Sequence, residues 1–313
     1  MRARRSILVL LAIALLCRGL PGQSLRFAVI GDGGTGDDQQ KRVLAAMAAR
    51  HAKHPWKLAL LAGDNIYEDG NPEYFAAKFR EPFKTLVDRG VVIHSALGNH
   101  DRVHPAARLG CAQVEEESFG YAGKRDEYVL EEGPVVDGRR LARFLVINSS
   151  AWIDQYVDRS GDKTACRGAS EDRRRQLERW LGDSARYHWN ILVSHHPLYS
   201  YVFLSGLLGG HGSSKGLRDL IEPLLKGRVD VVFAGHDHFY QRIKPHFGIQ
   251  HFVTGGGAKL RFGGNFRHRD VAYGAKRRHF LDIELTRDEL RFWAVDEEGR
   301  EFDSGSVRKA PKR

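Results

Sequence analysis

Five short polar motifs recur along the 313-residue chain, each directly after an apolar run typical of a β-strand. The runs are RFAVI, LALLA, VVIHSAL, NILV and VDVVFA, and the motifs are GDGG (31–34), GDNIY (63–67), GNHD (98–101), SHHP (194–197) and GHDH (235–238). In an open α/β sheet the carboxyl ends of the strands share one edge. We therefore expect an α/β fold in which residues distant in sequence converge on one crevice.

The side chains in these motifs are those that bind metal ions. They comprise carboxylates, a phenol, a carboxamide and imidazoles, without cysteine: Asp32, Asp64, Tyr67, Asn99, His195, His236 and His238. Oxygen and nitrogen donors of this kind suit Fe, Mn or Zn, and they exceed what one ion needs. Two neighbouring ions can hold both oxygens of an in-line displacement and lower the pKa of a bound water, as phosphate ester hydrolysis requires.

Taken singly, each residue has a simpler explanation. Asp32 or Asp64 could form an Asx-turn or cap a helix, Tyr67 could be a half-buried amphipathic residue, and Asn99 could be a turn residue. Independent turns would not supply complementary ligands after five strands, so the joint pattern favours a two-ion site. Histidines without a motif are expected on the surface or in packing: His51, His54, His94, His188 and His251.

The motifs resemble those of the calcineurin-like metallophosphoesterases, and among them the small purple acid phosphatases related to tartrate-resistant acid phosphatase. The resemblance spans roughly residues 25–300. Tyr67 narrows the choice, because the purple enzymes use a tyrosine three residues after the GD aspartate as a phenolate ligand to Fe(III). The resemblance implies that Fe(III) is held by Asp32, Asp64, Tyr67 and His238. It implies that a divalent ion (Fe, Zn or Mn) is held by Asp64, Asn99, His195 and His236.

The resemblance also implies roles in the reaction. His195 is preferred to its neighbour His196 as the ligand, because the family ligand lies two residues before a proline, here Pro197. His100 and His211 resemble residues that orient phosphate and protonate the leaving group. The expected function is a secreted acid phosphatase that hydrolyses phosphate monoesters by attack of metal-bound hydroxide. The alternatives are a phosphodiesterase or nucleotidase on the same metals, and a non-catalytic protein that binds metal or phosphate.

The first 24 residues have the layout of a secretory signal peptide. Three arginines precede an apolar run from Ile7 to Cys17, and small residues follow up to Ser24. A membrane anchor is the alternative, but the run is shorter than the roughly 20 residues that span a bilayer. We therefore expect a secreted or periplasmic protein without a stable membrane anchor. Export would leave Cys111 and Cys166, for which we expect a disulfide, with two free thiols as the alternative.

The chain carries a formal net charge of +10, which falls to +6 without the signal peptide because that segment has four arginines and no acid. A positive surface can attract phosphorylated substrates. The basic residues occur in scattered pairs and triplets without interleaved aromatics, so we expect a small phosphate ester as partner and no nucleic acid. The oligomeric state stays open.

The remaining patterns predict one metallophosphoesterase domain over residues 25–305, followed by a basic tail at 306–313. Helices are expected at 37–50, at 170–181 with Ser170 as cap, and at 217–225. From residue 250 onward, three apolar stretches predict antiparallel strands, with TRDE (286–289) as a hairpin turn. The natural architecture is a four-layer sandwich of two mixed β-sheets flanked by helices, with the metal site at the carboxyl ends of the strands.

Overall fold

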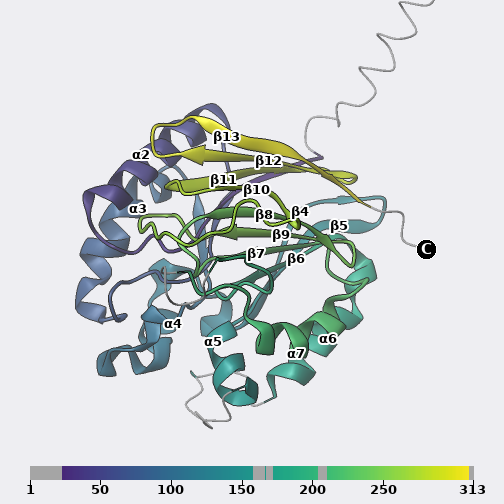
Figure 1. Cartoon of the computed structure of the whole chain (residues 1–313), viewed down its shortest axis with the longest axis horizontal. Coiled ribbons are helices and arrows are strands. Elements are labelled where there is room, and N and C mark those ends of the chain that lie inside the picture. Colours follow the sequence, from purple (N-terminus) through teal and green to yellow (C-terminus); the bar gives the residue numbers. More distant parts are fainter. Residues whose placement is uncertain (1–22, 158–165, 167–171, 204–209, 310–313) are drawn as a thin grey trace, which may run out of the picture.

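Two mixed β-sheets pack against each other, with helices on their outer sides (Figure 1). The computed structural model describes residues 23–157, 166, 172–203 and 210–309. The predicted four-layer α/β sandwich is confirmed. The six-stranded sheet has the order β13-β12-β11-β1-β2-β3. Its strands are β1 (Leu25–Ile30), β2 (Leu58–Leu61), β3 (Val92–Ser95), β11 (His279–Leu285), β12 (Glu289–Asp296) and β13 (Glu301–Arg308).

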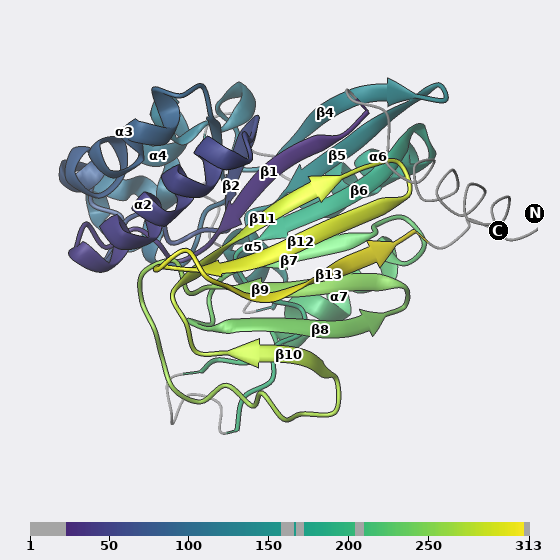
Figure 2. The same ribbon diagram turned by 90° about the horizontal axis from the view of Figure 1, so that it is seen from above.

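The seven-stranded sheet has the order β10-β8-β9-β7-β6-β5-β4. Its strands are β4 (Tyr128–Val136), β5 (Arg139–Val146), β6 (Tyr187–Ser194), β7 (Val231–Ala234), β8 (Tyr240–His246), β9 (Ile249–Thr254) and β10 (Val271–Ala275). Strands β1, β2 and β3 run parallel in the first sheet, as do β5, β6, β7 and β9 in the second. Figure 2 shows the strands of the first sheet lying over those of the second.

Helices α2 (Asp38–Lys53) and α3 (Glu81–Val87) lie on the side of the first sheet, whereas α6 (Arg173–Gly182) and α7 (Lys215–Leu225) cover the outer side of the second (Figure 1). Two short helices, α4 (Cys111–Glu115) and α5 (Ser149–Trp152), follow β3 and β5. Short helical turns complete the connections, among them His100–Arg102. Of the helices in the described ranges, none is long and apolar enough to cross a membrane.

The main core lies between the two sheets. Phe27 of β1 contacts Phe144 of β5 edge to face, with ring centroids 5.1 Å apart, and Phe252 of β9 contacts Phe292 of β12 at 5.0 Å. All residues of β2, β6, β7 and β9 are buried. Because both faces of these strands are covered, their sequences are continuous apolar runs rather than alternating patterns.

The predicted helices are present with shifted ends. Asp37 caps α2 by accepting hydrogen bonds from the backbone N–H groups of Gln39 and Gln40, and the helix continues three residues beyond Arg50. Its buried residues include Val43, Leu44 and Met47, which lie at helical spacing. Helix α6 is capped by Asp172, whose side chain accepts from Arg175 N; the predicted cap Ser170 lies outside the described residues. Helix α7 begins at Lys215, two residues before the predicted start.

The C-terminal strands are partly as predicted. The hairpin between β11 and β12 is confirmed, and Thr286 N donates to Glu289 O across its turn at 2.9 Å. The expectation for the first of the three stretches was wrong in one respect: β9 joins the other sheet, antiparallel to β8 but parallel to β7. Its wholly buried side chains suit a central strand rather than the edge of a hairpin.

The two ends of the chain are where the expected signal peptide and the expected end of the domain lie. Residues 1–22, which include most of the expected signal peptide, lie outside the described residues. Strand β13 pairs with β12 up to Arg308, three residues beyond the expected domain end at 305. A disulfide joins Cys111, at the start of α4, to Cys166, so the structure selects this alternative over two free thiols.

Candidate metal centre

The five motifs lie together where the parallel strands of both sheets end. Asp32 follows β1 and Asp64 follows β2, and both residues adopt positive φ angles of 59° and 55°. Aspartate is among the few residues other than glycine that tolerate this left-handed conformation. Asp32 N donates to Gly63 O at 3.0 Å, which ties the two loops together.

A first group of donors surrounds the hydroxyl of Tyr67. This oxygen lies 3.0 Å from Asp32 Oδ1, 2.8 Å from Asp64 Oδ2 and 3.1 Å from His238 Nε2. Asp32, Asp64 and His238 each offer one ligand atom within 4.8 Å of the others. All four side chains are buried.

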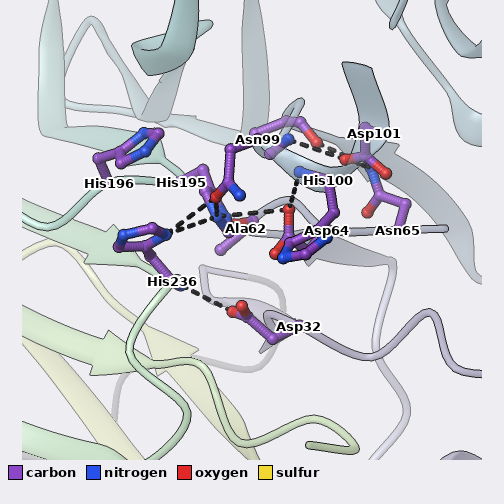
Figure 3. Close-up of polar contacts among 12 residues, drawn as sticks. Asp32, Ala62, Asp64, Asn65, Asn99, His100, Asp101, His195, His196 and His236 are labelled. Carbon is purple, nitrogen blue, oxygen red and sulfur yellow. Dashed lines mark hydrogen bonds and ion pairs between the residues drawn. The ribbon is translucent and has the colours of Figure 1, made fainter. Parts of the chain in front are cut away.

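A second group lies on the other side of Asp64 (Figure 3). Asn99 Oδ1 is 2.9 Å from His195 Nε2 and 3.0 Å from His236 Nδ1, and the two nitrogens are 3.2 Å apart. His195 Nε2 also lies 3.4 Å from Asp64 Oδ1. Asp64 therefore contacts the first group through Oδ2 and the second through Oδ1. The structure thus brings all seven predicted ligand residues together in two groups that share Asp64.

Two glycines permit this close approach. A Cβ atom on Gly98 would lie 2.1 Å from Asp64 Oδ1, and one on Gly235 would lie 2.4 Å from Asp32 Oδ2. Both distances are far below van der Waals contact. Any other residue at these positions would displace a carboxylate. Steric crowding therefore explains why the motifs have glycine at positions 98 and 235.

Burial is the largest influence on the titrating groups of this centre. Burial raises the pKa of the Asp32 carboxyl to about 8; His195 lowers this pKa and the nearby Asp64 raises it. Burial, then Asp32 and Asp64, raise the pKa of Tyr67 well above its usual value. Burial lowers the pKa of His238 to about 4, and that of His236 also falls well below its usual value.

These shifts support the fit of metal ions. A cation supplies the positive charge that would keep buried carboxylates and a phenolate ionised, and neutral imidazole is the form that binds a metal. The donors are oxygens and imidazole nitrogens in two groups of four with one shared carboxylate. The residues therefore fit two metal ions that prefer oxygen and nitrogen ligands.

The two predicted catalytic histidines lie on opposite sides of the centre. The ring of His100 is 4.7 Å from the Tyr67 ring, its backbone N donates to Asp64 Oδ1 at 3.0 Å, and its Nδ1 contacts Glu68 O. The ring of His211 is 4.3 Å from that of His236. His211 is exposed, whereas the first donor group is buried.

Two acids inside the motifs have roles that the sequence analysis missed. Asp101 of GNHD is buried and accepts hydrogen bonds from Gly98 N at 2.8 Å, Ile66 N at 2.9 Å and Gln113 Nε2 at 2.7 Å. Asp101 therefore ties the loops after β2 and β3 to α4. The signal that could have identified it is its position in the GNHD motif, two residues after the candidate ligand Asn99.

Asp237 of GHDH has the same kind of role on the other side. Its carboxylate accepts from the backbone N of His211 at 2.7 Å, from Gly212 N at 3.0 Å and from Ser200 Oγ at 2.5 Å. It therefore ties the loop that carries His211 to the loop between His236 and His238. Three histidines without a motif bond instead to backbone atoms elsewhere, as expected of packing residues: His51, His94 and His188.

Comparison with known proteins agrees with this geometry. The family model "Calcineurin-like phosphoesterase" matches residues 25–240. "Purple acid phosphatase 7" of Arabidopsis thaliana is 27% identical over 301 residues, covering 91% of this chain and 87% of that protein. "Tartrate-resistant acid phosphatase type 5" of Oryctolagus cuniculus is 24% identical over 271 residues, covering 80% of this chain and 79% of that protein.

Solved structures show the same fold. The purple acid phosphatase PPD1 from yellow lupin superposes with a TM-score of 0.66 and 18% identity, over 92% of this chain and 55% of that one. GAP50 of Plasmodium, described as the anchor in the inner membrane complex, superposes with a TM-score of 0.72 and 17% identity, over 93% of this chain and 90% of that one. At these identities the likeness shows the fold alone.

Proposed function

We infer that this chain, which belongs to the calcineurin-like phosphoesterase family, hydrolyses phosphate monoesters at a site for two metal ions. The observation that carries the proposal is the position of Asp64. Its two oxygens contact two separate groups of donors, Tyr67 on one side and His195 on the other. A single carboxylate shared by two donor groups is what two adjacent ions require.

The assignment of ligands follows the two groups. Asp32, Tyr67 and His238, together with Asp64, would hold Fe(III). Asn99, His195 and His236, again with Asp64, would hold a divalent Fe, Zn or Mn ion. The phenol oxygen in the first group supports a ferric ion there, and the acid phosphatases among the relatives support the same choice. When bound, the two ions would polarise the phosphoryl group and lower the pKa of an attacking water.

The chain's own residues would admit and orient the ester from the side of the second group. Asn99 and His236 are partly exposed and His211 is exposed, whereas the first group is buried. The phosphoryl group can therefore reach the centre beside His236.

A histidine would protonate the leaving group, and two histidines lie near enough to the donor groups to be considered. His211 lies on the open side, against His236, and Asp237 holds its backbone. His100 lies on the other side, against Tyr67. We propose His211 or His100 as the general acid, which must come within hydrogen-bond distance of the leaving oxygen.

A second candidate of another class is a protein that binds metal or phosphate without turnover. The fold also occurs in a protein described as an anchor, so the fold alone does not establish catalysis. The positions of His100 and His211 beside the donor groups favour the enzyme, because a binding protein needs no proton donor.

Export is part of the proposal. The disulfide between Cys111 and Cys166 suits an oxidising compartment. Residues 1–24 would be removed as a signal peptide, leaving a domain that starts at Leu25 and a basic C-terminal end. Amino-terminal sequencing of the protein recovered outside the cytoplasm tests this, and an intact Met1 there would contradict cleavage.

The test of the function compares two substrates that share one leaving group. Single-turnover rates of metal-loaded protein are measured on 4-nitrophenyl phosphate and on bis(4-nitrophenyl) phosphate. Faster turnover of the monoester supports the phosphatase, and faster turnover of the diester identifies a phosphodiesterase. Protein that holds both ions and turns over neither ester is a binding protein. Asp64→Asn should abolish turnover, whereas Asp219→Asn on the exposed face of α7 is the matched control.

A further inference from the structure

His196, the second histidine of SHHP, is held by a serine from a distant part of the chain. Its Nδ1 lies 2.9 Å from Ser149 Oγ, and its backbone N donates to the same oxygen at 3.0 Å. Ser149 is wholly buried at the start of α5, and His196 keeps 9% of its surface exposed. His196 therefore has two contacts with one hydroxyl, one through its ring and one through its backbone N.

These two links determine which ring nitrogen of His196 carries the proton. The backbone N–H must donate to Ser149 Oγ. If Nδ1 also donated, the buried hydroxyl proton of Ser149 would have no acceptor among the residues that the structure describes. A buried donor without an acceptor destabilises the fold. The satisfied arrangement has the Ser149 hydroxyl donating to Nδ1, which leaves the ring proton on Nε2.

The Nε2 atom is the ring nitrogen of His196 that Ser149 leaves free for a ligand. Within the described part of the chain it has no hydrogen-bond partner, and it is not among the fully buried unpaired polar atoms. The His196 ring lies 4.4 Å from that of His236 (Figure 3). The ring of His211 lies 4.3 Å from His236. His196 and His211 thus both pack against His236.

We propose that His196 donates its Nε2–H to a phosphoryl oxygen of the bound ester, and that Ser149 is the positioning residue that keeps the proton on that atom. The inference rests on the proposed function, because it assumes that a phosphoryl group lies beside His236. It gives the second histidine of SHHP a role distinct from that of His195, whose Nε2 faces Asn99 and Asp64.

Buried polar contacts fix the start of α5, where Ser149 lies. Asn148 caps α5 by accepting from Ala151 N, and its amide donates to Asp126. Glu127 accepts from Asn148 N at 3.1 Å. Asn148 is 2% exposed. Asn148 therefore fixes the position of Ser149 beside His196.

Two substitutions of His196 separate the proposal from a packing role. His196→Gln places an amide N–H near the position of Nε2, whereas His196→Asn reaches only the position of Nδ1 and keeps an acceptor for Ser149. The dissociation constant of inorganic phosphate is measured by calorimetry on metal-loaded protein. We expect His196→Asn to weaken phosphate binding about 10–100-fold, as for a lost hydrogen bond to a charged group, and His196→Gln to stay within about threefold. His188→Gln, near the far end of β6, is the control.

Metal content is measured in the same samples. Both His196 variants should keep the metal content of the wild type. An equal change of phosphate affinity in the two variants, no change in His196→Asn, or loss of an ion from either variant overturns the proposal. The binding measurement needs no turnover. If the wild type binds phosphate through His196 but hydrolyses no ester, the proposed function fails while this inference stands; a wild type that binds no phosphate overturns the inference.

Ser149 has its own test, which does not depend on variants of His196. Ser149→Ala should weaken phosphate binding about 2–10-fold, the effect of one neutral hydrogen bond. Ser149→Thr, which keeps the hydroxyl, should restore the affinity. Nitrogen-15 spectra of zinc-loaded protein should show His196 protonated on Nε2, and a mixture of tautomers in Ser149→Ala. A ring protonated on Nδ1 in the wild type, or an unchanged tautomer in Ser149→Ala, overturns the role of Ser149.

Discussion

Gly98→Ala should damage the candidate centre although it replaces none of the proposed ligands. The added Cβ would lie 2.1 Å from Asp64 Oδ1, 2.3 Å from Asp64 N and 2.8 Å from Asp64 Cγ. The first distance is 1.3 Å short of the 3.4 Å at which ordinary contact begins. Because one of the clashing atoms is backbone, a side-chain rotation alone cannot relieve the overlap.

The cost has two parts. Overpacking of this kind destabilises a folded chain by about 1–3 kcal/mol. Displacement of the carboxylate shared by both donor groups should also weaken metal binding by more than the roughly 100-fold seen when a supporting residue is lost. At metal concentrations well above Kd, a 100-fold weaker affinity removes about 2.7 kcal/mol of metal-dependent stabilisation.

The assay is thermal unfolding with and without added metal, together with metal analysis of the purified protein. Gly182→Ala is the control, because its added Cβ meets no atom within 4 Å. Gly182 also ends helix α6, where alanine is favourable. The wild type and Gly182→Ala should gain stability on metal addition, and Gly98→Ala should not. A Gly98→Ala protein with both ions bound and an unchanged Tm would refute the packing argument.

Three further predictions concern single residues. Tyr67→Phe should abolish the visible charge-transfer band that a phenolate on Fe(III) produces, and a variant that stays coloured would show that Tyr67 is not the chromophoric ligand. His211→Ala should keep its metals but lose about 10²–10⁴-fold in turnover of alkyl phosphates and much less with nitrophenyl phosphate; equal losses would assign His211 to positioning. His279 is buried between Thr254 Oγ1 and Arg277 O, and burial lowers its pKa from 6.5 to about 4. Below pH 6.5 the unfolded chain therefore binds a proton at this residue that the folded chain excludes. The contribution of His279 to the free energy of unfolding is complete above pH 6.5. It falls by up to about 3 kcal/mol as the pH is lowered towards 4. His279→Asn, which keeps a donor to Arg277 O, should reduce that slope in urea unfolding curves, and an unchanged slope would count against this assignment.

The general position of the centre could be predicted from the sequence because it depends on local pattern. Apolar runs ending in GD, GNH or GH predict strands followed by tight loops, and the carboxyl ends of parallel strands meet at one edge. The mixed sheets and the closeness of Asp32, Asp64 and His238 followed from this reasoning. Helix α2 was also predictable, because its buried residues have helical spacing.

Other features depend on contacts between residues far apart in sequence. Strand β9 pairs with β7 and β8, and no local pattern in its six residues states which sheet it joins. Asp101 bonds to Ile66, 35 residues away, and to Gln113, 12 residues away. His196 and Ser149 are 47 residues apart. A sequence shows the residue type at such positions but not its partner, so these roles came from the structure.

The most direct test of the two-ion centre is the metal content of four proteins, determined per chain by elemental analysis. The wild type should hold two ions. His238→Ala should lose the ion of the first group, and His236→Ala should lose the ion of the second. Asp64→Ala, which removes the carboxylate that contacts both groups, should lose more metal than either histidine variant. A wild type with one ion, or an Asp64→Ala protein that keeps as much metal as His238→Ala and His236→Ala, would contradict a centre of two ions that share Asp64.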